Sequence, residues 1–573
     1  MTRVFRLIYG RLSRALSWRP LPLVVMLLLA VYTLLRAAQG LNLSDDGFVL
    51  TAYAEVFAAP GSVAYMFLYY WTVVAGGAWN AVAGGLGIYG FRLLECVVLA
   101  ANGVLAARLS TGAGGRWLYA ALGLVVLYAR LNWIEVFEYN TFTALVTLVV
   151  VALMMRALVR RSCAWMFAAG VALGLDVFVR LPNVCLGLLI VVLVPYYRRC
   201  RDGRLAVGLL LAAAGGVVAG VALTVGCMAL AGHLGYFAEA LSHAAFLSAD
   251  PDNSHGAGSL LLAVGRNWAL YAIGFGLAAL CPVLSLLVEG RVGSKALRRL
   301  LHGLLAAVWL ALMFAFRNNH IYMINALALA ACAYVAYERR ACLRTVCLAW
   351  LAALVALLMP LGSDLGVLST GVHNLWAAAP FVPWACALLL KRLSGGRRAA
   401  VAAYAVATLA LVMAKGAAAT MAPAYYERGT RLTDVSAAGH PRANVLTDAL
   451  TASAVDGALT VMRAHVSPGD TVLCAGDTPL LHYLTATRPY MRNPWPSVFG
   501  RAYFERQLGG ALRGGGRLPV AVCRSADYYV TDGWRPAFRR FLEAGGYRRV
   551  YADDVFMVFV PQRNDAVGTA PSD

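Results

Sequence analysis

The sequence predicts a mostly α-helical protein that crosses a membrane many times and carries a small α/β domain at its C-terminal end. Hydrophobic residues make up 61% of the 573 residues and charged residues only 13%, which is not the composition of a soluble globular protein. Apolar runs of membrane-spanning length recur as far as Lys415. Beyond that residue the composition changes to that of a soluble domain, which gives the chain two parts.

The formal charge of +21 is explained by membrane topology. The basic residues lie in short clusters between the apolar runs, where the positive-inside rule places them, so the charge does not indicate a nucleic-acid partner. The first apolar run follows a basic arm and lacks a small-residue cleavage site, so we interpret it as a retained span. The twelve cysteines show no CxxC or Cys/His spacing typical of a zinc or redox site.

A membrane-crossing helix needs about 20 apolar residues. With this length the sequence predicts thirteen transmembrane helices, near residues 20–39, 90–109, 117–130, 141–157, 163–179, 183–197, 205–230, 268–288, 301–316, 321–337, 344–360, 375–390 and 399–418. The apolar segment from Tyr65 to Ala83 is predicted to lie at the interface, because only then do all basic clusters fall on the side of the N-terminal arm. The N-terminus is therefore expected in the cytoplasm and the C-terminus outside it.

This topology divides the chain into a transmembrane module (1–421) and a soluble α/β domain (422–573). Within the first module, residues 40–89 form a long outer loop made of interfacial helices. Alternating strands and helices predict the α/β domain, with helices at 447–464 and 536–544 and strands at 471–474, 520–523, 528–530, 548–551 and 555–560. We assign this domain no independent catalysis, because it lacks phosphate-loop and nucleophile-elbow motifs. Cys474 and Cys523 either pair in an oxidising compartment or remain buried thiols on neighbouring strands.

Two adjacent acids, Asp45 and Asp46, follow the first span in the stretch Asn42-Leu-Ser-Asp-Asp-Gly-Phe48. Neighbouring carboxylates in a poor dielectric must raise one pKa or recruit a cation, so the pair is either well solvated or used in chemistry. A cap on the next helix, expected at 47–59, is the simplest alternative. Glu135 and Glu138, in the second outer loop, are further acidic candidates.

These features give the chain a resemblance to the integral-membrane glycosyltransferases of the GT-C class, in the branch of the protein O-mannosyltransferases and lipid A aminoarabinose transferases. The resemblance rests on Asp45-Asp46 before an interfacial helix, a second interfacial apolar segment, Phe91-Arg92 opening the second span, about thirteen spans and an external α/β domain. The chain has Asp-Asp where the family more often has Asp-Glu, and it lacks the Pro-Pro pairs of the following loop. The run from Gly476 to Pro496 is similar to bacterial members of the class, which implies a bacterial inner membrane.

The resemblance implies transfer of a hexosyl or pentosyl group from a polyprenyl-phosphate donor to a hydroxyl of a glycan, lipid or protein acceptor on the periplasmic side. It implies that Asp45 is the general base, with Asp46 and Glu138 as the other catalytic acids. The donor phosphate would be bound by cations at the outer ends of spans, for which the candidates are Arg92, Arg180, Arg266, Arg317, His320 and His373. The carboxylates of Asp45, Asp46 and Glu138 would suit Mg²⁺ or Mn²⁺, although the sequence does not require a metal.

Two other classes of function are compatible with the composition. A transporter or flippase of lipid-linked saccharides should show an internal repeat and spans broken near the midplane, and the sequence shows neither, since its unusual polar residues collect at one surface. A non-catalytic lipid-binding subunit would bind the donor without turnover. The arrangement of the polar residues favours the enzyme.

Overall fold

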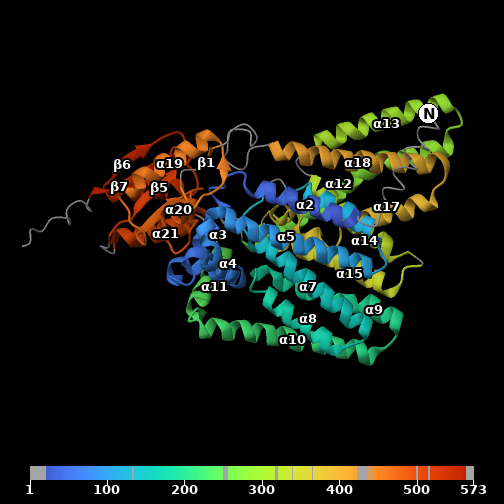
Figure 1. The fold of residues 1–573 in the computed structure, drawn as a ribbon, viewed down its shortest axis with the longest axis horizontal. Coiled ribbons are helices and arrows are strands. Elements are labelled where there is room, and N and C mark those ends of the chain that lie inside the picture. The colour runs from blue at the N-terminus through green and yellow to red at the C-terminus, as the bar shows by residue number, and fades with distance from the viewer. Residues whose placement is uncertain are drawn as a thin grey trace, which may run out of the picture.

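The protein is described by a computed structural model that covers residues 21–131, 134–249, 256–316, 320–338, 340–363, 365–421, 436–437, 440–498, 501–513 and 517–562. This part of the chain is mostly helical, as the composition predicts. Figure 1 shows the long helices side by side along the longest axis, with the small C-terminal domain at one end of the bundle.

The N-terminal half of the bundle is built from α2 (Leu21–Ala37), α3 (Asp45–Glu55), η1 (Pro60–Tyr69), α4 (Tyr70–Ala83), η2 (Gly84–Leu86), α5 (Gly87–Gly112), α6 (Trp117–Tyr128), α7 (Tyr139–Arg160), α8 (Cys163–Asp176), η3 (Leu181–Val192), α9 (Leu193–Cys200) and α10 (Gly203–Leu230). It continues with α11 (Leu234–Ala249), α12 (Ala257–Arg291), α13 (Lys295–Ala315), α14 (His320–Ala336), α15 (Leu343–Leu358), α16 (Val367–Thr370), η5 (His373–Leu375), α17 (Phe381–Arg392) and α18 (Gly395–Met421). The η elements are 3-10 helices.

Among the described residues, seven helical segments are long and apolar enough to cross a membrane: Pro60–Gly112, Tyr139–Arg160, Leu181–Cys200, Gly203–Leu230, Gly258–Arg291, Lys295–Ala315 and Gly395–Ala418. The apolar helices Leu23–Ala37, Trp117–Tyr128, Cys163–Asp176, His320–Ala336 and Leu343–Leu358 are shorter. Length and composition therefore support a membrane protein with several spans. The count of thirteen stays a prediction.

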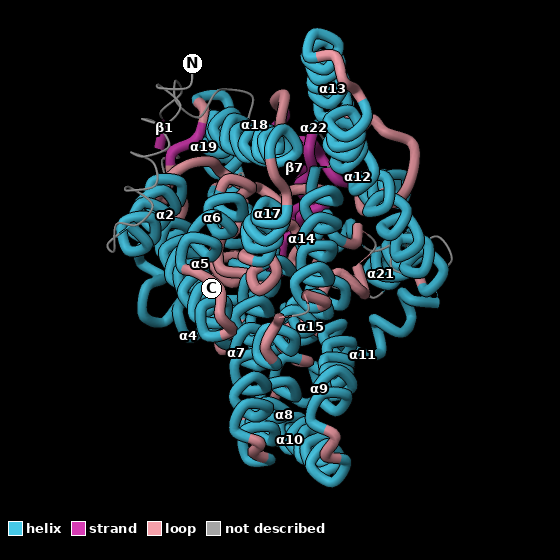
Figure 2. Tube along the Cα trace, turned by 90° about the vertical axis from the view of Figure 1, so that its right-hand side faces the viewer, coloured by secondary structure: helices cyan, strands magenta, loops and turns pink. Residues whose placement is uncertain are grey.

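Viewed from the end opposite the C-terminal domain, the bundle has a centre and two flanks (Figure 2). Helices α8, α9 and α10 group on one flank, and α12, α13 and α18 lie on the other. Between them, α5, α6, α7, α14, α15 and α17 share one continuous apolar core with large buried side chains such as Tyr128, Trp376 and Phe381. This packing holds together segments far apart in sequence, such as α5 and α17.

The C-terminal domain is a small α/β module. Its five-stranded sheet has the order β4-β3-β5-β7-β6, in which β4, β3 and β5 run parallel and β7 and β6 join antiparallel. Its elements are β1 (Ser436–Ala437), β2 (Leu446–Thr447), α19 (Ala449–Arg463), β3 (Thr471–Ala475), α20 (Leu480–Thr485), β4 (Arg488–Pro489), η6 (Pro496–Val498), α21 (Arg501–Arg513), β5 (Val520–Arg524), α22 (Ser525–Tyr528), α23 (Arg535–Ala544), β6 (Tyr547–Ala552) and β7 (Phe556–Pro561).

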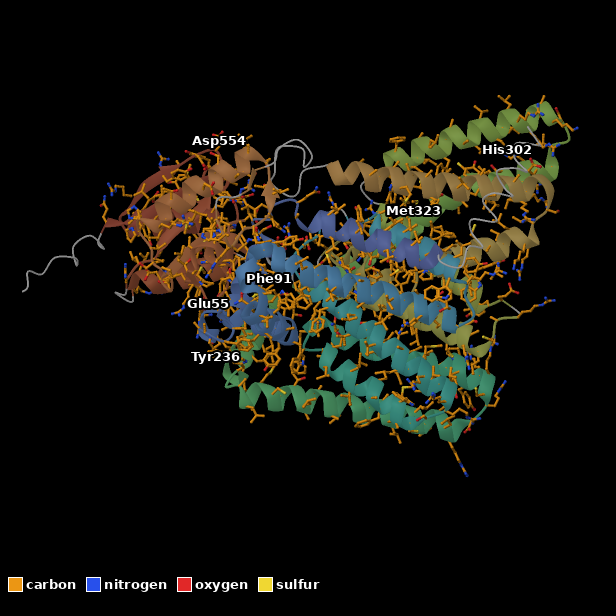
Figure 3. All side chains as sticks on the ribbon, viewed as in Figure 1. Glu55, Phe91, Tyr236, His302, Met323 and Asp554 are labelled. Atoms are coloured by element: carbon orange, nitrogen blue, oxygen red, sulfur yellow. The ribbon has the colours of Figure 1, made fainter. Side chains whose placement is uncertain are left out.

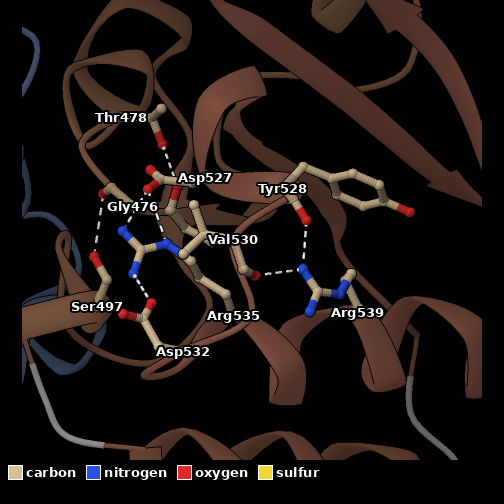
Figure 4. A network of polar contacts seen from close by, with 10 residues as sticks. Gly476, Thr478, Ser497, Asp527, Tyr528, Val530, Asp532, Arg535 and Arg539 are labelled. Carbon is tan, nitrogen blue, oxygen red and sulfur yellow. Dashed lines mark hydrogen bonds and ion pairs between the residues drawn. The ribbon is translucent and has the colours of Figure 1, made fainter.

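Four of the five predicted strands lie within one or two residues of an observed strand, and the fifth prediction, Tyr528–Val530, is wrong. This segment forms the end of α22 and a turn. Its backbone carbonyls at Tyr528 and Val530 accept hydrogen bonds of 2.5 and 2.6 Å from the guanidinium of Arg539, as Figure 4 shows. The side chain of Arg539, on α23, therefore occupies backbone acceptors that a neighbouring strand would otherwise bind.

Cys474 and Cys523 lie on the paired strands β3 and β5, and both are buried free thiols. Cys474 belongs to the apolar cluster on one face of the sheet and Cys523 to the cluster on the other. Because successive strand side chains point to opposite faces, the register separates the two sulfur atoms. Of the two alternatives, a disulfide or two buried thiols, the structure shows two unpaired thiols.

The C-terminal module docks onto α3 and its neighbours. The amide of Leu480, at the start of α20, donates a 3.0 Å hydrogen bond to the carbonyl of Leu43. A second backbone bond, 2.9 Å long, runs from the amide of Ile88 to the carbonyl of Arg442. Figure 3 places Glu55 and Phe91 at this boundary and Asp554 on the outer surface of the module. The acidic helix α3 is thus held between bundle and module.

Candidate active site

Helix α3 begins at Asp45, two residues before its predicted start, so both acids of the pair lie in its first turn. Just before it, the side-chain oxygen of Asn42 accepts hydrogen bonds from the amide and the hydroxyl of Ser44, both 3.0 Å long. This turn directs the chain into the helix. Carboxylates in the first turn are stabilised by the unpaired amides and the positive end of the helix dipole.

Asp46 has its partners inside the protein. Its side chain is 1% exposed, and its Oδ2 lies 2.9 Å from a guanidinium nitrogen of Arg92 on α5. Its Oδ1 accepts a 3.2 Å hydrogen bond from the amide of Val136. Burial raises the pKa of Asp46, while Arg92 and the Val136 amide oppose that rise. These two hydrogen bonds favour the ionised carboxylate and so act against the effect of burial.

Loss of one partner of this pair is expected to destabilise the fold. Asp46→Asn leaves the buried Arg92 without its counter-ion, and removing one partner of a buried ion pair costs about 3–5 kcal/mol. The double variant Asp46→Asn/Arg92→Gln should lose less than the sum of the two single variants, because it leaves no unpaired charge. Thermal unfolding of the detergent-solubilised protein measures all three, and additive losses would show that the two side chains do not interact.

The loop of residues 134–138 is tied to α3. Besides the bond from Val136 to Asp46, the hydroxyl of Tyr53 on α3 donates a 2.7 Å hydrogen bond to the carbonyl of Phe137. The ring of Tyr53 is also stacked on Phe91 at 5.6 Å. These contacts bring Glu135 and Glu138 next to the first turn of α3, which is how residues 90 positions apart come to share one site.

Asp45, Glu135 and Glu138 all line a cavity of about 600 Å³, within the range of small-molecule sites. The cavity lies where α3, the loop after α6, the start of α7, the segment around α16 and η5, and the C-terminal module meet. Its lining consists of Asp45, Asp46, Phe48, Val49, Arg130, Leu131, Glu135, Val136, Glu138, Tyr139, Asn140, Ile321, Leu365, Leu368, Ser369, Gly371, Val372, His373 and Trp495.

Glu138, which directly precedes α7, has a strongly perturbed pKa. Burial, together with the neighbouring carboxylates of Glu135 and Asp45, raises its pKa to about 8, although hydrogen bonds from Asn140 oppose the rise. One of these is a 3.1 Å bond from the Asn140 side chain to Oε2. The raised pKa favours the protonated form of Glu138 at neutral pH.

This shift predicts a pH dependence of stability. The unfolded chain loses the Glu138 proton near the ordinary pKa of 4.5, whereas the folded chain keeps it up to about 8. Between these values the folded state binds more protons, so stability falls as the pH rises and the loss is complete above about pH 8. In Glu138→Gln the melting temperature should fall less over this range than in the wild type. The exposed Glu543→Gln is the control, and equal slopes in wild type and Glu138→Gln would contradict the assignment.

The predicted phosphate-binding cations are dispersed. His373 lines the cavity, and burial lowers its pKa to about 4, so at neutral pH it is a neutral hydrogen-bonding group. Arg92 and Arg180 are buried against backbone carbonyls, with Arg92 bound to Ala37 and Gln39 and Arg180 to Met359. His320 is buried and hydrogen-bonded to the carbonyl of Met313 at 2.9 Å. Arg266, on α12, is not among the residues that line the cavity, and Arg317 lies outside the described residues.

Arg130 is a cation of the cavity that sequence reasoning passed over. It lines the cavity, and its Nε is buried without a hydrogen-bond partner among the described residues. The sequence places Arg130 at the end of an apolar run, where it is indistinguishable from a residue that meets lipid headgroups. Only the fold brings it to the same cavity as the acids.

The sequence leaves open a divalent metal at Asp45, Asp46 and Glu138. Both oxygens of Asp46 are engaged by Arg92 and Val136. No group of three His, Cys, Asp or Glu side chains among the described residues is arranged to hold a metal ion. A divalent metal at these acids stays a prediction, and the reaction proposed below is written for the protein side chains alone.

The chain was also compared with other proteins. Neither the protein-family models nor the curated proteins with which it was compared match it.

Proposed function

We propose that the protein is a membrane glycosyltransferase that moves a sugar from a polyprenyl-phosphate donor to a hydroxyl group of an acceptor. The observation that carries the proposal is the cavity itself. It combines a carboxylate at a helix N-terminus, a guanidinium with an unpartnered donor and an apolar wall. The guanidinium matches the donor phosphate, the carboxylate matches the acceptor hydroxyl, and the apolar wall matches the lipid chain.

The surroundings of each acid indicate its role in the proposed reaction. Asp46 is held by Arg92 and Val136, so it is a positioning residue that fixes the first turn of α3. Burial raises the pKa of Glu138, so we assign it the role of a proton-bearing hydrogen-bond donor. Asp45 lines the cavity in a half-buried position, and we assign it the role of general base.

In the proposed reaction the acceptor oxygen attacks the anomeric carbon of the donor. A new carbon–oxygen bond forms as the bond between the anomeric carbon and the phosphate oxygen breaks. Asp45 takes the proton of the acceptor hydroxyl, and the polyprenyl phosphate leaves with the bonding electron pair. Arg130 stabilises the charge that develops on the phosphate, and His373 donates or accepts a hydrogen bond at the same wall.

The proposed setting is a bacterial inner membrane crossed thirteen times, with the N-terminus in the cytoplasm and the C-terminal module in the periplasm. The distribution of basic clusters between the apolar runs supports this orientation. The position of the cavity also supports it, because the cavity lies at the end of the bundle that carries the module, next to the apolar side chains Leu365 and Leu368.

The test is a transfer assay with the purified full-length chain in proteoliposomes. Radiolabelled polyprenyl-phosphate hexoses and pentoses are supplied together with glycan, lipid and peptide acceptors. Formation of a labelled acceptor with release of polyprenyl phosphate is expected. Movement of the labelled lipid across the bilayer without transfer would instead favour a flippase and contradict the proposal.

A further inference from the structure

One wall of the cavity is aromatic. Phe48 lies on α3 one turn after Asp45. Its ring contacts Trp495 of the C-terminal module edge to face, with ring centroids 6.2 Å apart. Phe48 also contacts Tyr69, with ring centroids 6.5 Å apart, and Tyr69 is stacked on Tyr139 with ring centroids 4.5 Å apart. Phe48, Tyr139 and Trp495 all line the cavity. The aromatic row therefore runs from the module, past the proposed base, to the residue that follows Glu138.

The module holds Trp495 in place through a closed loop. The amide of Trp495 donates a 3.0 Å hydrogen bond to the side chain of Asn493, and the hydroxyl of Ser497 donates a 3.2 Å bond to the carbonyl of Gly476 (Figure 4). Gly476 has a φ of +75°, a conformation that glycine adopts readily. Asp527, which lies beside Gly476, forms an ion pair with Arg535, and Arg535 also pairs with Asp532. Trp495 thus belongs to an ordered part of the module.

The apolar side chains of the cavity come from different elements. Ile321 lies on α14, and Leu365, Leu368 and Val372 belong to the segment around α16. Leu365 is 51% exposed and Leu368 45% exposed, so apolar surface continues outside the cavity. An aliphatic lipid chain matches this side. The aromatic and acidic side of the cavity is then available to the second substrate, the acceptor.

Resting on the proposed function, we infer that the wall formed by Phe48, Tyr139 and Trp495 is a saccharide-binding subsite and that the acceptor is a carbohydrate. The C–H face of a sugar ring packs on an aromatic face, while its several hydroxyls donate to the carboxylates beside it. A serine or threonine of a protein offers a single hydroxyl, and a simple lipid alcohol has no ring to stack. A carbohydrate satisfies both features of this wall at once.

The subsite is tested by binding, without any donor. The full-length protein in nanodiscs is titrated by calorimetry with gluco-, manno-, galacto- and xylo-trisaccharides and with a serine-containing peptide of similar size. At least one trisaccharide should bind more tightly than the peptide. Trp495→Ala should weaken that binding about ten-fold, which corresponds to about 1.4 kcal/mol, and Trp495→Phe should restore most of it. Tyr529→Ala, an aromatic residue of the same module that is 68% exposed and outside the cavity, should bind like the wild type.

The outcomes separate this inference from the proposed function. If no trisaccharide binds, or if Trp495→Ala binds as tightly as the wild type while its melting temperature is unchanged, the inference is overturned. Sugar transfer to a peptide or lipid acceptor in the assay above would then still support the glycosyltransferase. Conversely, saccharide binding that depends on Trp495, with no transfer from any donor, would overturn the proposed function and leave the subsite standing.

Discussion

Replacement of Asp45 by Asn is expected to reduce the rate of sugar transfer by about 10²–10⁴-fold, the usual contribution of a general base. The amide keeps the size of the carboxyl group but cannot take the acceptor proton. The fold should persist, because Asp45 is half-buried at the cavity, whereas Asp46 is the residue held by the ion pair to α5. The measurement is initial transfer rate at saturating donor, with a thermal unfolding curve for each variant.

Asp554→Asn provides a matched control. It makes the same chemical change on an exposed acid of the outer surface of the module (Figure 3), which is not among the residues that line the cavity. Its rate should equal that of the wild type. If Asp45→Asn transfers sugar at the wild-type rate, Asp45 is not the base, and the role would pass to Glu135 as a remaining acid of the lining.

The local features of the site are those that the sequence could predict. The Asp45-Asp46 pair stands out because two acids directly follow an apolar span, and α19, β3, β5, β6 and β7 follow from alternation and turn residues. Glu138 is reachable by the same argument, since it precedes an apolar run. Each of these predictions depends only on residues that are close together in the sequence.

The remaining features depend on contacts between distant segments. Arg92 binds Asp46 across 46 positions and Trp495 meets Phe48 across the whole membrane module, and no short-range pattern encodes either contact. The sequence therefore predicts Arg92 as a phosphate ligand, while the structure uses its guanidinium to hold an acid. The aromatic wall escaped prediction for the same reason, because Phe48 and Trp495 each look like isolated apolar residues.

Gly47 shows how a distant contact constrains a single residue. It stands between Asp46 and Phe48, inside α3, where glycine is a poor helix former. The backbone of α20 passes so close to it that a Cβ atom would overlap the amide and Cα of Leu480 and the carbonyl carbon of Pro479. The absent side chain is what allows the module to rest on the acidic turn.

Gly47→Ala is therefore expected to displace the module from α3 and to lower the transfer rate about 10²-fold, since a misplacement of about 1 Å at a reacting centre has an effect of that size. The clash is with backbone, so no rotation of a side chain relieves it. The hydrogen bond from Leu480 to Leu43 should be lost first. Hydrogen exchange of the Leu480 amide and the susceptibility of the module to limited proteolysis report the displacement directly.

Two variants separate this clash from other effects. Gly226→Ala, in α10, adds the same methyl group where no atom lies within 4 Å, so it should leave both activity and exchange unchanged. Arg488→Ala removes the half-buried ion pair to Glu55 at the same junction but leaves the backbone contacts of α20 in place, so the module should stay docked. If Gly47→Ala keeps wild-type exchange and activity, the approach of α20 is not what positions the acids. If Arg488→Ala releases the module as fully as Gly47→Ala does, charge rather than backbone packing holds the junction.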